Sequence, residues 1–126
     1  MKNTFVTIAL FLAMLGFIFY SHNTLIKVCT HVEEHCTDIE KALDKKDMEN
    51  AYKYSLEIKD ILEEKATPIA IYVNHTDINN LNNEVIRLSQ YIKENEISEC
   101  YASVHTVKYS CKYIHDLETI SIKNIF

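Results

Sequence analysis

Apolar residues recur along most of the chain at alternating spacings of three and four positions, the pattern expected of a helix with one buried face. Beyond residue 23 this pattern occurs in four successive stripes, which short polar breaks separate. The stripes comprise Leu25, Val28, Cys29, Val32, Cys36, Ile39 and Leu43; Ala51, Ser55, Ile58, Leu62, Lys65, Ala66, Ile69 and Val73; Ile78, Leu81, Val85, Leu88 and Ile92; and Ile97, Cys100, Val104, Val107, Cys111, Ile114 and Leu117. Because short connections between long helices make neighbours antiparallel, we expect an all-α fold with an antiparallel up-down four-helix bundle over residues 23–118.

Polar breaks at residues 44–47 and 95–96 mark two of the helix connections. The third break is Asn74-His75-Thr76-Asp77, where Asn tolerates the left-handed conformation that ends a helix and Thr76 or Asp77 can cap the next one. A histidine and a carboxylate at such a corner could also bind a ligand or titrate near neutral pH. We favour the structural role, because helix caps require these residue types at these positions.

Pro68 interrupts the second stripe, since proline removes one helical hydrogen bond and kinks or ends a helix. The stripe stays in phase across Pro68, so we expect one long kinked helix. The alternative is a break with Thr67 as the N-cap and Pro68 at the first helical position.

Residues 4–20 carry no charge and are apolar on all sides. As a helix they cover ~25 Å, a little less than the ~30 Å hydrocarbon core, and residues 21–26 can extend the helix into the interface. Phe17 to Tyr20 are large, so the small residues of a signal-peptide cleavage site are missing. We therefore expect a short flank at residues 1–3 and an uncleaved transmembrane signal-anchor helix at residues 4–22, with a cleaved signal peptide as the alternative.

The C-terminal segment, residues 119–126, breaks the helical period, because Ile120 and Ile122 alternate with polar residues. Large apolar residues should not remain free in water. We expect an extended tail that packs on the bundle. The alternative is a segment that docks on a partner through its apolar residues, Ile120, Ile122, Ile125 and Phe126.

Composition and charge narrow the possible functions. The chain has 126 residues with one Gly and one Pro, which excludes glycine-based phosphate loops. All 18 acidic residues and all but one of the 13 Lys and Arg lie beyond residue 20, so nucleic acid and anionic lipid are poor partners for this part. The basic residues that flank the apolar segment favour a cytoplasmic N-terminus, which places the bulk of the chain outside the cytoplasm.

The stretch CTHVEEHC, residues 29–36, resembles a metal motif, because His31, Glu34 and His35 fit the H-x-x-E-H pattern of inverted zinc proteases. Helical turning places both histidines ~80–120° away from the cysteines, and such a protease needs a larger domain with a further ligand. We therefore expect a solvated His/Glu face with no metal, no cofactor and no catalytic residue.

The cysteines lie on the apolar stripes of the first and last predicted helices. Helical rise separates Cys29 from Cys36 by ~10.5 Å and Cys100 from Cys111 by ~16.5 Å, beyond the ~7 Å limit between Cα atoms in a disulfide. Between antiparallel neighbouring helices, Cys29–Cys111 or Cys36–Cys100 can form easily, but both together need a tilt. An extracytoplasmic location permits oxidation; the alternative is buried thiols that behave as small hydrophobic residues.

Two stretches resemble a known family. Residues 73–78, followed by Leu81, Val85 and Arg87-Leu88, are similar to the hinge and third helix of the family called domain of unknown function 4363, from low-GC Gram-positive bacteria. The ending at residues 121–126 resembles its closing motif. The resemblance implies an N-terminal hydrophobic segment, a helical remainder and a neighbouring integral membrane protein as partner, but no activity. Members often carry Trp in the second helix, which this chain lacks, and the cysteines are not a family feature.

These expectations describe a single-pass membrane protein with a helical domain outside the cytoplasm. The sequence contains no nucleophile–base set and no ordered pair of carboxylates, so we expect no enzymatic activity. We interpret the chain as a protein-interaction or adaptor module that binds through its acidic bundle surface or its apolar tail. The alternative is a bundle that senses a small ligand or the state of the cell envelope.

Overall fold

The computed structural model describes residues 1–70 and 75–125, without the side chains at positions 69, 70, 121, 122 and 125. Every regular element among these residues is helical, and no strand occurs among them. The elements are α1 (Lys2–Asp44), α2 (Met48–Ile61), the π-helical turn η1 (Leu62–Ala66), α3 (Thr67–Ala70), α4 (His75–Lys93) and α5 (Ile97–Ile125). The predicted all-α class is confirmed.

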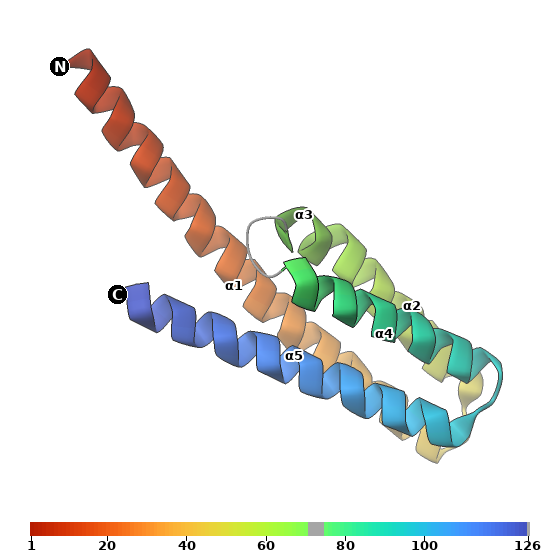
Figure 1. Cartoon of the computed structure of the whole chain (residues 1–126). Helices are drawn as coiled ribbons and strands as arrows, with labels where there is room; N and C mark the ends of the chain where they lie inside the picture. Colours follow the sequence, from red (N-terminus) through yellow and green to blue (C-terminus); the bar gives the residue numbers. More distant parts are fainter. Residues whose placement is uncertain (71–74, 126) are drawn as a thin grey trace.

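One hydrophobic core joins the long helices. The C-terminal half of α1 packs beside α2 and α5, and α4 packs beside the same two helices (Figure 1). Nearly every described position of the four predicted stripes is buried in this core. The exceptions are Lys65 and Ile97, which are exposed, and Leu117, which is half-buried. Burial of this apolar surface is the dominant force that holds the helices together.

The N-terminal half of α1 projects beyond the other helices (Figure 1). Its large apolar side chains are exposed, with Phe5 at 78%, Leu10 at 67% and Phe11 at 55%. The predicted N-terminal apolar helix is therefore present, and it is long and apolar enough to cross a membrane. It continues without a break into the half of α1 that packs in the core.

Two helix connections, α1–α2 and α4–α5, have the same geometry. Lys46 and Asn95 both adopt a left-handed backbone with φ of 58°. The N–H groups of Lys46 and Asn95 donate to carbonyls three residues back, and those of Asp47 and Glu96 donate to carbonyls five residues back. These bonds satisfy carbonyl groups that the end of a helix would otherwise leave unpaired.

The helix around Pro68 continues, as the in-phase stripe predicted. The backbone of Thr67 is helical, with φ of −58° and ψ of −44°, and its N–H donates to the Leu62 carbonyl five residues back. The Thr67 hydroxyl donates to the same carbonyl at 3.1 Å. A turn with this wider bonding accommodates a proline ring that would clash with a regular α-turn. The alternative of Thr67 as a non-helical N-cap is therefore wrong.

Helix α4 begins two residues earlier than a cap at Thr76 requires, and three residues earlier than a cap at Asp77 requires. It starts at His75, so Thr76 and Asp77 lie inside its first turn and do not occupy the N-cap position. Asn74 lies outside the described residues. Asp77 still favours the helix, because a carboxylate in the first turn interacts with the positive end of the helix dipole.

The predicted extended tail is wrong, because α5 stays helical to Ile125. The chain from Ile97 to Ile125 contains neither Gly nor Pro, so nothing local ends the helix once it has formed. The Thr119 hydroxyl donates to the His115 carbonyl four residues back, a bond along the helix. Ile120 is 55% exposed; the side chains of Ile122 and Ile125, and all of Phe126, lie outside the described residues.

Candidate functional site

The predicted solvated His/Glu face of α1 is exposed at two of its residues and contacts α2 through the third. His31 and Glu34 are exposed, whereas His35 is half-buried. The His35 ring lies between the His31 carbonyl, 2.9 Å from Nδ1, and the Glu57 carboxylate on α2, 3.1 Å from Nε2. The ring also meets Tyr54 edge to face, with centroids 6.3 Å apart. His35 thus ties α1 to α2, and the described residues contain no group of three side chains that could hold a metal.

All four cysteines are buried free thiols. The neighbouring thiol of Cys29 across the α1–α5 contact, together with burial, raises the pKa of the Cys111 thiol. Burial, and then the negative charge of Glu40, raise the pKa of Cys36 to about 12. Burial also raises the pKa of Cys100. Thiols of this kind stay protonated near neutral pH and react slowly, and a Cys29–Cys111 disulfide remains a prediction.

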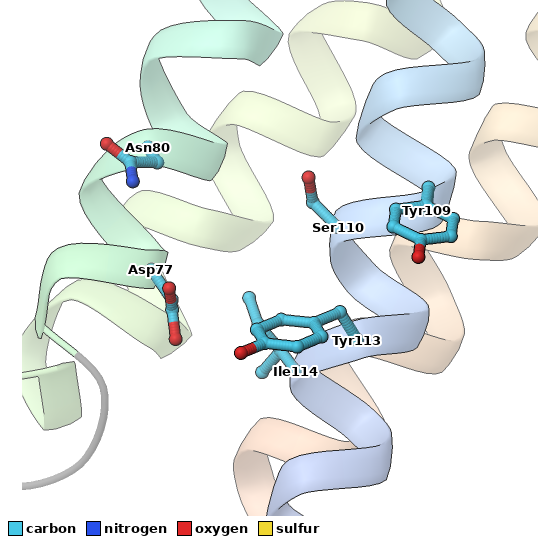
Figure 2. A pocket seen from close by; sticks show the side chains of 6 residues that line it. All are labelled: Asp77, Asn80, Tyr109, Ser110, Tyr113 and Ile114. Carbon is cyan, nitrogen blue, oxygen red and sulfur yellow. The ribbon is translucent and has the colours of Figure 1, made fainter.

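The predicted corner residues do not form one group. Asp77 lines a cleft of about 300 Å³ between α4 and α5, together with Asn80, Tyr109, Ser110, Tyr113 and Ile114. Figure 2 shows Asp77 on α4 facing the ring of Tyr113 on α5. His75 is exposed and its Nε2 lies 3.4 Å from the side-chain nitrogen of Asn79. The cleft beside the corner therefore offers one carboxylate and several hydroxyls, and His75 is not among its described lining residues.

The outer side of α5 carries exposed apolar and aromatic residues. Tyr109 is 68% exposed, Tyr113 is 52% exposed and Ile120 is 55% exposed. Helical turning of ~100° per residue brings all three within about 40° of one another. Together they form one strip, which we call the α5 strip. Exposed tyrosines grouped in this way are typical of protein-binding surfaces.

A polar cluster is buried where α1 leaves the domain. Ser21 and Glu118 are 1% and 2% exposed, and His22 contacts the Glu118 carboxylate from α1. Among the described residues, the Ser21 hydroxyl has no hydrogen-bond partner. Sequence reasoning missed this cluster, although a signal was present: Ser21 precedes Leu25 by four positions and Glu118 follows Ile114 by four, so both continue a buried stripe.

These features define a class of protein with an all-helical domain on a long apolar helix. The profile of the family described as "Domain of unknown function (DUF4363)" matches residues 19–125. The chain therefore belongs to this family, as its motifs predicted. No curated protein and no solved structure matches the chain. The family match covers the helical domain and only the last residues of the apolar segment.

Proposed function

We propose that this protein is a membrane-anchored adaptor whose helical domain binds another protein. In this proposal residues 4–22 cross the membrane once, the bulk of the chain lies outside the cytoplasm, and the helices form an antiparallel up-down bundle. The packing of α1 and α4 against α2 and α5 is compatible with that bundle. The unbroken course of α1 would hold the domain close to the membrane surface.

The α5 strip is the observation that carries this proposal. Tyr109, Tyr113 and Ile120 expose apolar surface on a helix whose opposite side is buried in the core. Burial of exposed tyrosines stabilises protein interfaces strongly, because each ring contributes a large apolar area with few rotatable bonds. Helix α5, which carries the strip, runs toward the end of the domain from which α1 projects (Figure 1). An integral membrane protein is therefore the partner that the strip can reach most easily.

Site-specific photo-crosslinking in native membranes tests the adaptor function. A photoreactive phenylalanine analogue replaces Tyr109, Tyr113 or Ile120 in the full chain. The matched control carries the analogue at Leu56, an apolar residue of α2 that is 37% exposed. We expect one discrete adduct with an integral membrane protein from the α5 positions and none from Leu56. No adduct, or equal adducts from all four positions, would contradict the proposal.

The corner cleft supports a second candidate, a sensor of a small ligand. Its volume of about 300 Å³ and the polar side chains in its lining, which include Asp77, Asn80 and Ser110, suit a small molecule with polar groups. A screen of small polar metabolites by thermal stabilisation of the full chain in detergent would test this function. Asp60, an exposed residue of α2, provides the control. Stabilisation that is lost in Asp77→Asn but remains in Asp60→Asn would favour the sensor.

A further inference from the structure

A second, larger cleft lies between α1 and the π-turn. It has a volume of about 480 Å³ and lies on the side of α1 that meets η1 and α3. Among the described residues of the lining, Lys27, His31 and Lys65 are basic and Glu64 is acidic. The cleft is therefore locally basic in a chain with a formal net charge of −5.

The π-turn places Lys65 in this cleft. The second apolar stripe left two candidates for one core position, Lys65 and Ala66, and the structure buries Ala66 and exposes Lys65. Lys65 thereby shares the cleft with Lys27, a residue 38 positions earlier on α1. The sequence shows scattered lysines, and only the folded chain brings these two to one place.

The cleft also lies at a defined level along α1. Tyr20, which ends the uncharged segment, lines it at one end, and Lys27 lies about 10 Å further along the helix axis. If residues 4–22 cross the membrane, as the proposed function requires, this level coincides with the lipid headgroups. Figure 1 shows α3 at the end of the domain from which α1 projects.

We propose that this cleft binds the phosphate group of an anionic phospholipid from the adjoining leaflet. Lysine ammonium groups attract phosphate as point charges, and each basic side chain near a membrane surface strengthens binding to anionic lipid. Tyr20, Val28 and Ile61 supply an apolar wall along which the glycerol and upper acyl carbons can lie. This inference rests on the membrane anchor, and it revises for one site the expectation that anionic lipid is a poor partner.

Lipid retention by the full-length protein tests the assignment. The protein is exchanged into detergent micelles with equal amounts of phosphatidylglycerol and phosphatidylcholine, and bound lipid is counted by native mass spectrometry. We expect severalfold preferential retention of phosphatidylglycerol. Lys27→Gln with Lys65→Gln should abolish the preference, whereas the charge-matched control, Lys53→Gln with Lys93→Gln, should keep it. Equal loss of the preference in both double variants would contradict a binding site in the cleft, since it would show that the lipid responds only to the overall charge of the protein.

Two further measurements separate the possible failures. Excess glycerol phosphate should leave the bound phosphatidylglycerol in place, because the lipid site also needs the acyl carbons. Displacement by glycerol phosphate would overturn the lipid assignment in favour of a soluble phosphate ester. Alkaline extraction of native membranes tests the anchor itself. Protein that resists extraction but shows no lipid preference refutes the cleft alone, whereas extracted protein refutes the anchor and the lipid site with it.

Discussion

The two ends of the helical domain are built differently. At the end distant from the apolar segment, the α1–α2 and α4–α5 connections repeat one turn, with left-handed residues at Lys46 and Asn95. At the other end α1 leaves the domain, Pro68 follows a π-turn and Glu118 is buried beside His22. The distant end thus turns the chain twice with one repeated set of backbone hydrogen bonds, whereas departures from regular helix and from apolar burial gather near the proposed membrane. Departures of this kind are expected near functional sites.

A side-chain hydrogen bond also joins α1 to α5 at the distant end. The Tyr101 hydroxyl on α5 donates to the Asp44 carboxylate at the end of α1, at a distance of 2.5 Å. This hydrogen bond raises the pKa of Tyr101 above its ordinary value. Near the apolar segment, α1 contacts α5 through the buried pair of His22 and Glu118.

The largest effect should come from the core at the distant end. Ile92 is 1% exposed in the last turn of α4. Truncation by Ile92→Ala should lower the free energy of unfolding by ~2–5 kcal/mol, because it removes buried methyl groups and leaves a cavity. Chemical denaturation of the full chain in detergent measures the change. Ile86→Ala, at a residue of the same helix that is 45% exposed, should change stability by less than ~0.5 kcal/mol; equal losses would contradict the core assignment.

A disulfide between Cys29 and Cys111 would stiffen the end near the apolar segment. Two thiols exchange with one molecule of oxidised glutathione, forming one protein disulfide and releasing two molecules of reduced glutathione. Because the two buried thiols lie close enough to interact across the α1–α5 contact, we expect the disulfide to form and to raise the free energy of unfolding by ~2–4 kcal/mol. Peptide mapping of the oxidised protein checks the pairing, with Cys29→Ser as the control. A product joined through Cys36 or Cys100 would refute this pairing.

High pH should lower the free energy of unfolding through Cys36, which lies in the core between the two ends. The thiol of Cys36 has a pKa of about 12 in the folded chain, whereas it ionises near ~8.5 when unfolded. Above the lower value the unfolded state loses its proton first, so stability falls as pH rises toward the higher value. Unfolding curves between these pH limits measure the slope. Cys36→Ala should be less stable at neutral pH, but its free energy of unfolding should fall less as the pH rises. An identical slope in this variant would show that Cys36 does not cause the pH dependence.

The contact between His22 and Glu118 should contribute ~1–3 kcal/mol to the free energy of unfolding, because a buried carboxylate that loses its partner retains its desolvation cost. A double-mutant cycle with His22→Leu and Glu118→Leu in the full chain measures the coupling energy. The double variant should lose less stability than the sum of the losses in the two single variants. Asp44→Leu and Tyr101→Phe form the matched cycle at the distant end, where exposure to solvent should make the coupling energy smaller. Equal couplings would remove the distinction between the two ends.

The parts of the fold that the sequence predicts differ from the parts that it does not predict. The stripe from Ile78 to Ile92 follows directly from helical period, since every one of its members is buried. The helical course of residues 119–125 could not be read in this way, because Ile120 and Ile122 mimic the alternation of a strand. The cleft between Lys27 and Lys65 was also unpredictable, since only tertiary packing and the π-turn bring these residues together. Local periodicity thus predicts elements and their buried faces, whereas sites between elements need the fold.

The smallest effect concerns the two left-handed residues of the distant end. Asn tolerates a φ of 58° better than Lys does, since its short side chain can bond locally, so Lys46 is the more strained of the two. Lys46→Gly should therefore raise the free energy of unfolding by ~0.5–1 kcal/mol, and Asn95→Gly by only a few tenths. Denaturation of both variants in detergent measures the difference. The control is Lys45→Gly, at a residue with φ of −88°, which should lower stability, because glycine there only adds freedom to the unfolded chain. A gain from Lys45→Gly equal to that from Lys46→Gly would show that loss of a lysine charge, and not relief of backbone strain, stabilises this turn.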